Sequence, residues 1–491
     1  MSSPTNTQSI PAWDRWFHMT ARGSNLATEI RGGIVTFVTM AYIVVLNPLI
    51  VGTAKDINGN LPGGGQDFGV AISLVAAATA LIAGLMTIFM GVYGRFPIAI
   101  AAGLGLNGFL AFGLAPQMTW PQAFGLVILE GLIILVLVLT GFRQAVFHAV
   151  PDSLKYSIGS GIGLFIALIG LVDAGIVRSG VPLIGFGVNG ELAGWPIFTF
   201  VFGLLLLIVL VALRIRGGIL IGLLATTVVA VILESTYSIG AANTDPNAPG
   251  LENPTGWGLN VPAIPDQLFG FVNPAPLFSI DLFGAFSAIG VLAAGLAVFS
   301  LLLSDFFDTI GTVTGLAAEA DLMNSNGDVE HLDAILTVDS IAAIAGGAAG
   351  TSSNTAYIES ASGIGDGART GIASVVTGVL FLLAMFIAPL TKIVPYEAAA
   401  PALVIVGFLM MTQIRKIDFN DYSVAIPAFL TIILMPFTYS ITNGIGAGVV
   451  SYVLIKVAER KSKDIPGMMW IIAVAFTLYF AVHPLKELLG V

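Results

Sequence analysis

The sequence contains no cysteine and very little charge. Only 10% of its 491 residues are charged, whereas soluble domains have about 25%. Without Cys, the chain has no disulfide bonds, no thiolate nucleophile and no Cys-ligated metal. The formal net charge of -10 makes nucleic acid an unsuitable partner, because nucleic-acid binding depends on Lys and Arg. With 56% hydrophobic residues, the composition instead indicates a protein embedded in a lipid bilayer.

Motifs for bound cofactors are missing as well. No GxxxxGK[ST] phosphate loop and no HExxH spacing occurs. We therefore expect no cofactor, no metal site and no catalytic residue. The chemistry must come from polar side chains within apolar segments.

Apolar segments of membrane-spanning length cover the chain from end to end. Fourteen are expected to span: 32–52, 69–93, 97–115, 121–142, 155–175, 197–213, 217–234, 287–309, 333–350, 352–368, 370–391, 397–413, 421–440 and 442–457. A fifteenth stretch, 468–483, is short enough to lie in the membrane interface instead. If residues 1–29 form a cytoplasmic tail, most Lys and Arg residues fall on the cytoplasmic side, as the positive-inside rule requires. The loop 235–284 has no Lys or Arg and is then extracellular.

Two of these segments are too rich in Gly and small polar residues to be ordinary helices. They are FPIAIAAGLGLNGFLAF, from Phe96, and GGAAGTSSNTAYIESASGIG, from Gly346. Each is the third segment in its set of seven, and such paired interruptions indicate a transporter site built on inverted repeats. We expect each to run extended and then turn helical, near Leu106 and near Glu359. The extended parts could pair, and the helix N-termini could offer N–H donors to a ligand.

The stretch SDFFDTIGT gives one apolar segment a polar face. Asp305, Asp308, Thr309 and Thr312 share one side of a helix. An acid at membrane depth is a functional hypothesis by default. Two close carboxylates in a low dielectric do not both ionise easily, so one of them can carry a proton.

Structural roles are the alternative for each polar residue. Asp308 could bond a neighbouring helix, Asp305 could cap or pair with a Thr, and the carboxylate of Glu359 could be satisfied by its own helix N-terminus. In the first segment, Thr36, Thr39, Tyr42 and Asn47 form a polar side. Asn47 precedes Pro48 and is expected to end that segment.

Several motifs together resemble one known family. GLGLNGFLAF, SDFFDTIGT, GTSSNTAYIESASGIGDGARTGIASVVTG and PAFLTIILMPFTYSITNGI are similar to the AzgA-like purine permeases of the nucleobase–ascorbate (xanthine–uracil permease) superfamily, over about residues 28 to 457. The resemblance implies an all-α polytopic membrane protein with 14 transmembrane spans as 7+7 inverted repeats, in which spans 3 and 10 are broken by short antiparallel strands. It divides the chain into a tail (1–29), a core domain (30–142, spans 1–4, and 285–392, spans 8–11), a gate domain (143–284, spans 5–7, and 393–463, spans 12–14) and a C-terminal apolar segment (464–491).

The family also implies the function and the site. It implies a secondary active transporter in the cell membrane that imports guanine, hypoxanthine or adenine, in which Asp305 and Glu359 hold the base and Asn107 and Thr309 match family positions. From the residues themselves we add Phe306, Ser353 and Thr355 to the expected substrate-binding set. The carboxylate chemistry leads us to expect proton symport with alternating access. Proton coupling is expected at Glu359 or Asp308; carboxylate and hydroxyl oxygens also suit Na⁺, so sodium coupling stays an alternative. Dimers are common in the family, which makes a homodimer one candidate assembly.

Two other functions are alternatives to purine transport. An anion transporter of the same fold would bind its ligand at the helix N-termini, but Asp305 and Glu359 would repel an anion unless protonated. A membrane-embedded hydrolase could use Asp305 and Asp308 as acid and base. Such an enzyme usually needs a nucleophile with its base or a metal set, and neither motif occurs.

Overall fold

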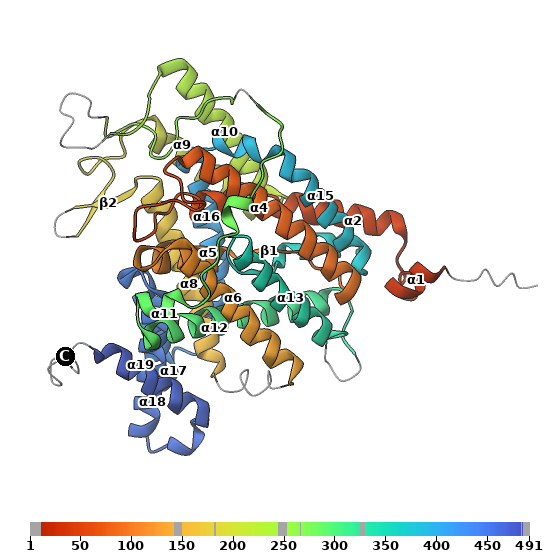
Figure 1. Cartoon of the computed structure of the whole chain (residues 1–491), viewed down its shortest axis with the longest axis vertical. Coiled ribbons are helices and arrows are strands. Elements are labelled where there is room, and N and C mark those ends of the chain that lie inside the picture. The colour runs from red at the N-terminus through yellow and green to blue at the C-terminus, as the bar shows by residue number, and fades with distance from the viewer. Residues whose placement is uncertain are drawn as a thin grey trace, which may run out of the picture.

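The computed structural model describes residues 11–141, 150–180, 183–243, 253–265, 267–324, 329–482 and 484. It is a bundle of helices in which segments from both halves of the chain interleave (Figure 1). The expected boundary between residues 142 and 143 lies outside the described residues, as do parts of the tail, of the loop 235–284 and of the C-terminal segment.

The long helices follow the predicted apolar segments. In the first half they are α2 (Leu26–Met40), α3 (Ile43–Val51), α4 (Phe68–Phe89), α6 (Trp120–Leu139), α8 (Asp152–Asp173), α9 (Trp195–Ala212) and α10 (Gly218–Tyr237). In the second half they are α12 (Val291–Glu319), α13 (Leu332–Ala348), α15 (Gly371–Ala384), α16 (Tyr396–Met411), α17 (Tyr422–Thr438), α18 (Ile441–Ala458) and α19 (Gly467–Phe480). Within the described ranges, ten helical stretches are long and apolar enough to cross a membrane, so the chain is a multi-pass membrane protein.

Short helical pieces complete the bundle. They are α1 (Ala12–Phe17), η1 (Met90–Gly94), α5 (Leu104–Gly108), η2 (Phe109–Leu114), η3 (Ala115–Gln117), η4 (Ala275–Leu277), α11 (Gly284–Ala288), η5 (Ile358–Ser360), α14 (Ala361–Gly365), η6 (Met385–Ile393), η7 (Thr412–Lys416) and η8 (Ser462–Asp464). Side chains satisfy several helix starts: Asn25 accepts from the Thr28 N–H, and Thr119 forms a capping box with Gln122.

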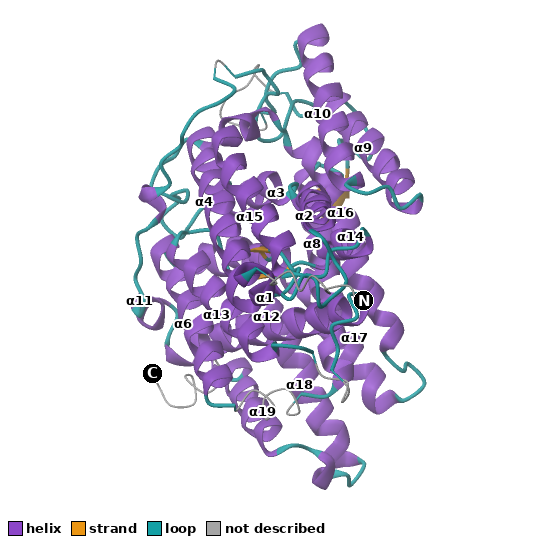
Figure 2. Cartoon of the chain, turned by 90° about the vertical axis from the view of Figure 1, so that its right-hand side faces the viewer, coloured by secondary structure: helices purple, strands orange, loops and turns teal. Residues whose placement is uncertain are grey.

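Two short antiparallel strand pairs interrupt the helices. β1 (Ile100–Ala102) pairs with β4 (Asn354–Ala356), and β2 (Val177–Ser179) pairs with β3 (Ile184–Phe186). Figure 2 shows one pair enclosed by helices at the centre of the molecule. All residues of β1 and β4 are buried, so this pair lies inside the protein, where its backbone groups need internal partners.

Two details of the first and eighth segments differ from the prediction. Residues 287–309 are not one helix: α11 ends at Ala288, Gly290 has a φ of 87°, and α12 starts at Val291 and continues to Glu319. A positive φ is incompatible with a continuing helix, which explains the later start.

Asn47 does not end α3 either. Its amide donates to the Thr79 hydroxyl at 2.8 Å and to the Thr351 carbonyl at 3.0 Å, and it therefore joins three segments inside the protein.

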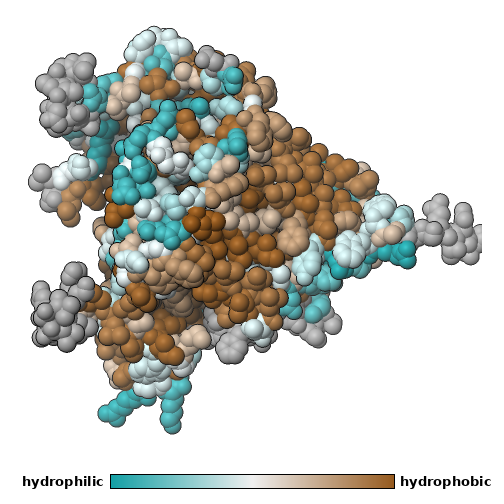
Figure 3. Space-filling view, in the orientation of Figure 1, coloured by the Kyte–Doolittle hydropathy of each residue, from teal (hydrophilic) through white to brown (hydrophobic). Residues whose placement is uncertain are grey.

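Apolar residues cover most of the middle of the face seen in Figure 3, and hydrophilic residues gather toward its margins. Large apolar side chains such as Leu205, Val228 and Leu454 are exposed on the surface of the protein. Such a surface suits contact with lipid.

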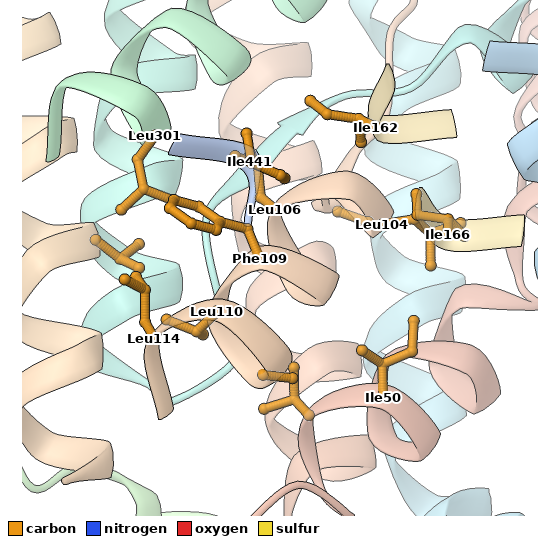
Figure 4. Packing of buried hydrophobic residues seen from close by; sticks show 14 of the residues in the cluster. Ile50, Leu104, Leu106, Phe109, Leu110, Leu114, Ile162, Ile166, Leu301 and Ile441 are labelled. Carbon is orange, nitrogen blue, oxygen red and sulfur yellow. The ribbon is translucent and has the colours of Figure 1, made fainter. Parts of the chain in front are cut away.

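The main hydrophobic cluster surrounds the short helix α5. Figure 4 shows Leu104 of α5 beside Ile166 of α8, while the ring of Phe109 points toward Leu301 of α12. A side chain at Gly105 would collide with Ile162 of α8, so this glycine permits the close approach of the two helices. The start of α5 is thus held between α8 and α12, at the depth of the central strands.

Candidate functional site

The two Gly-rich segments are broken as the sequence predicts. In each, an extended strand is followed directly by a helical turn: β1 by α5 at Leu104, and β4 by η5 at Ile358. The register places Ile100 opposite Ala356 and Ala102 opposite Asn354. The expected pairing of the extended parts is confirmed, and it brings both helix starts to the middle of the protein.

Backbone and side-chain groups extend this pairing beyond the strands. The Gly103 N–H donates to the Ser353 carbonyl at 2.9 Å, and the Tyr357 N–H donates to the Ala99 carbonyl at 3.0 Å. On the outer edge of β1, the Thr87 hydroxyl bonds both the N–H and the carbonyl of Ile100. The polar backbone of the break is thereby satisfied inside the protein, as a bilayer requires.

Asp305 lies in the middle of α12 and is fully buried. The Ser353 hydroxyl, just before β4, lies 3.4 Å from Asp305 Oδ2, and the Thr355 hydroxyl also hydrogen-bonds the Asp305 carboxyl group. Asp305 Oδ1 has no hydrogen-bond partner within the described chain. An unsatisfied buried carboxyl oxygen is costly, and it is therefore a place where a ligand can bind.

Thr309 and Thr355 connect α12 to the strand. Their hydroxyl oxygens are 2.6 Å apart, and Thr309 also donates to Asp339 Oδ1 on α13 at 3.0 Å. All three side chains are buried. Thr309 therefore serves this polar network, which fixes the position of β4 against α12.

Glu359 lies on η5, three residues beyond β4, and is half-buried. Tyr42 reaches it from the break between α2 and α3 and donates a hydrogen bond to Glu359 Oε1. The Thr39 hydroxyl lies 3.3 Å from the Glu359 backbone carbonyl. Two members of the polar side predicted for the first segment, Thr39 and Tyr42, thus contact Glu359, whereas Asn47 bonds Thr79 and Thr351 instead.

Asn107 is fully buried on α5, and neither its amide nitrogen nor its amide oxygen has a partner among the described residues. An amide with two unmet donors and an unmet acceptor rarely stays so in a native interior. The Asn107 amide is therefore a candidate for contact with a ligand.

Asp308 and Phe306 differ in their surroundings. Asp308 is half-buried, one turn after Asp305, and lies within electrostatic range of both Asp305 and Glu359. Phe306 is 1% exposed and belongs to the main hydrophobic cluster; its ring packs edge-on against Phe307 at 5.8 Å between centroids. This placement gives Phe306 a packing role.

The sequence reasoning missed Glu130 on α6. Its side chain is fully buried, and the Ser353 hydroxyl lies 3.5 Å from its Oε1. A signal was present, because a single acid inside the apolar run FGLVILEGLIILV satisfies the same rule that singled out Asp305.

Away from this site, salt bridges join the loops that connect the helices. Asp366, between α14 and α15, accepts from Arg216 of the α9–α10 connection and from Arg31 of α2, each at 2.5 Å. The hydrogen bonds from Arg216 and Arg31 hold the pKa of Asp366 below its usual value. Arg22 likewise bonds Glu330 at 2.8 Å and the backbone carbonyls of Arg95 and Arg369.

Comparison with known proteins adds sequence and fold relatives. Residues 27–446 match the model of a permease family (Xan_ur_permease). A putative permease of Methanocaldococcus jannaschii is 37% identical over 95% of this chain and 98% of its own length. A guanine/hypoxanthine permease of Bacillus subtilis is also 37% identical, over 95% of this chain and 98% of its own length. An adenine permease of Escherichia coli is 33% identical over 94% of this chain and 95% of its own.

Solved structures show the same fold at low sequence identity. The transmembrane domain of a cyanobacterial bicarbonate transporter, BicA, aligns with a TM-score of 0.57 at 14% identity, over 87% of this chain and 97% of that one. The murine anion transporter Slc26a9, in its inward-facing state, aligns with a TM-score of 0.57 at 12% identity, over 94% of this chain and 74% of that one. These likenesses concern the fold alone.

Proposed function

This chain belongs to the permease family that the sequence motifs predict, and we propose that it is a secondary active transporter of purine nucleobases. It is a transporter and not an enzyme, in agreement with the family and with its permease relatives. The substrate class is inferred from relatives named as guanine/hypoxanthine and adenine permeases.

The observation that carries the proposal is the unsatisfied amide of Asn107 in the short helix α5, which directly follows β1. A purine is flat and largely uncharged, with N–H donors and with ring-nitrogen or carbonyl acceptors. The Asn107 amide has one acceptor and two donors for such an edge. Asp305 Oδ1 and the Glu359 carboxylate can accept purine N–H groups, and charge-assisted hydrogen bonds of this kind are the strong ones.

The other residues expected at the site support Asp305 in this proposal and do not themselves contact the base. Ser353, Thr355 and Thr309 hold the Asp305 carboxyl group in place through the network described above. Phe306 completes the apolar wall behind Asp305. Because missing partners are penalised in a dry site, this arrangement favours bases with matching donors and acceptors.

We further propose proton symport with alternating access. In this scheme, spans 1–4 and 8–11 form a core that carries the site, and spans 5–7 and 12–14 form a gate, which gives 14 spans in two inverted sevens. Rocking of the core against the gate exposes the site to each side in turn. Glu359 or Asp308 carries the coupled proton, with Na⁺ as the alternative ion. The protein then lies in the cell membrane with a cytoplasmic N-terminus, as a monomer or homodimer.

An anion as the cargo is disfavoured by the site itself. Although the fold is shared with anion transporters, two acidic groups lie near the ends of β4: Asp305 contacts Ser353 just before the strand, and Glu359 lies on η5 just after it. These groups would repel an anion when ionised, whereas they suit the N–H groups of an uncharged base.

The proposal is tested by uptake of labelled guanine, hypoxanthine, adenine, xanthine and uracil into proteoliposomes, with and without an inward proton gradient. Purine accumulation that needs the gradient supports it. Absence of purine uptake contradicts the substrate, and equilibration that ignores the gradient contradicts symport. A sodium gradient at constant pH separates the two coupling ions.

A further inference from the structure

Glu130 and Asp305 place two carboxyl groups in contact inside the protein. Both side chains are fully buried, and their carboxyl groups lie close enough to interact directly. The Ser353 hydroxyl lies between them, 3.5 Å from Glu130 Oε1 and 3.4 Å from Asp305 Oδ2. Because a hydroxyl group has one proton, Ser353 can donate to only one of the two carboxyl groups at a time.

Each carboxyl group also keeps one oxygen that no described group satisfies, namely Glu130 Oε2 and Asp305 Oδ1. Ionised carboxylates accept hydrogen bonds but cannot donate them. Contact between two such groups is therefore favourable only when one of them carries a proton, as in other pairs of buried carboxyl groups. The geometry requires a proton that the serine does not supply.

Among the described residues, the charged groups that face the pair are acidic. Asp339 of α13 faces both members of the pair, and Asp308 of α12 faces Asp305 and, on its other side, Glu359 of η5. Lys155 of α8 lies over the Phe307 ring instead, 5.2 Å from its centroid. The buried polar side chains of the described residues include no Lys or Arg. Nor do the described residues contain a group of three acidic or His side chains placed to hold a metal ion. A proton is therefore the cation that this arrangement suits.

We propose that Glu130 and Asp305 form one proton-binding pair, in which Glu130 holds the proton while Asp305 accepts the purine N–H group. This inference rests on the proposed function. When the base binds, the proton leaves the Asp305 carboxyl group and joins a Glu130 oxygen; only these O–H bonds change. Glu130 is a positioning residue for the charge of Asp305 and does not touch the base.

The pair predicts a specific dependence of affinity on pH. With one proton, Asp305 is ionised and accepts the base. With two protons, Asp305 is neutral and loses that role. When the pair carries no proton, its two adjacent buried charges repel each other and destabilise the site. Affinity should pass through a maximum and fall on both the acid and the alkaline side.

The test is equilibrium binding of labelled hypoxanthine or guanine over a range of pH, in the wild type and in Glu130→Gln. On the alkaline side, the pair should contribute a fall in wild-type affinity of about tenfold per pH unit, as the loss of one linked proton requires. Gln cannot lose a proton, so Glu130→Gln should lose this contribution, while a fall that comes from Glu359 or Asp308 and the acid fall should stay. Glu397→Gln, which alters another buried acid at the start of α16, should keep both. An unchanged alkaline fall in Glu130→Gln overturns the proposal.

A second measurement needs no base. In pH-difference infrared spectra of the full chain, the wild type and Glu397→Gln should show the carbonyl band of a buried protonated carboxyl group that Glu130→Gln lacks. If the wild type binds no purine but shows this band, the proposed function fails and the shared proton stands. If the band persists in Glu130→Gln, the shared proton fails. Should Glu130→Gln not fold, Glu130→Asp keeps the test open: its alkaline fall must move along the pH scale, and an unmoved one contradicts the pair.

Discussion

The Tyr42 hydroxyl donates a hydrogen bond to Glu359 Oε1, although the two residues are 317 positions apart in the chain. Tyr42 is 1% exposed and lies where α2 ends and α3 begins, so the break in the first segment points its ring toward η5. The bond holds one carboxyl oxygen of Glu359 in place, next to the hydrogen bond that its side chain makes with its own backbone.

Tyr42→Phe should weaken purine binding by roughly 10–100-fold, the range expected for a lost hydrogen bond to a charged group. The ring still fills its place, so the fold should be kept. Titration calorimetry with hypoxanthine measures the change. Tyr452→Phe, on α18, serves as the control and should bind as the wild type does. Equal affinity in Tyr42→Phe and wild type would show that this bond does not position Glu359.

Asp305→Asn and Glu359→Gln should each reduce purine binding by at least about tenfold, because each removes a charged acceptor from a dry site. Both replacements keep the side-chain size, so expression and the elution volume in size-exclusion chromatography should stay unchanged. Scintillation proximity binding with labelled guanine measures the effect. Wild-type binding in either variant removes that residue from the site.

Asp308→Asn separates binding from coupling. If Asp308 carries the symported proton, exchange of labelled base across the membrane should continue while gradient-driven accumulation is lost. Exchange and accumulation are compared in the same proteoliposome preparation. Accumulation at the wild-type level assigns the carrier to Glu359 instead, and an unfolded variant assigns Asp308 to structure.

Thr355→Val should destabilise the protein by about 1–2 kcal/mol, because it removes the hydroxyl that joins β4 to Thr309 and leaves buried partners unsatisfied. Thermal unfolding in detergent measures this loss. Thr226→Val is a matched control: that hydroxyl is also buried but bonds only the Gly222 carbonyl of its own helix. A smaller loss for Thr355→Val than for Thr226→Val would contradict a structural role of the Thr309–Thr355 contact.

Arg216→Ala should destabilise the protein near neutral pH by less than about 1 kcal/mol, since Arg216 and Arg31 are largely exposed and water and salt screen their charges. The pKa of Asp366 is lowered in the folded protein. Its contribution is therefore present above the usual Asp pKa and is lost as the pH falls through the lowered value. The difference in melting temperature between variant and wild type should shrink on acidification and on adding salt. A difference that grows toward acid pH would contradict the ion pair.

The broken segments were predictable because their cause is local. Gly, Ser and Thr at high density weaken a helix, and a bilayer tolerates irregular backbone only where protein satisfies it. The polar face of α12 was equally predictable from the spacing of Asp305, Asp308 and Thr309. These two patterns lead to the strand pair and to the acid beside it.

The partners of the site residues could not be predicted, because they depend on packing between distant segments. Nothing near Tyr42 in the sequence identifies Glu359 as its acceptor. Glu130 has the composition of a functional acid, but its contact with Asp305 follows only from how α6 packs on α12. The late start of α12 depends on the positive φ of Gly290, which composition alone does not reveal.

The pairing of β1 with β4 is made by main-chain groups. The register of the two strands is therefore set by the main chain, while side chains such as Thr87 and Thr355 hold the pair against its neighbours. Residues such as Asn107 and Ser353 can be exchanged without rebuilding the scaffold. Under the proposed function, a change of cargo preference then requires the replacement of such side chains and not of the strand pair.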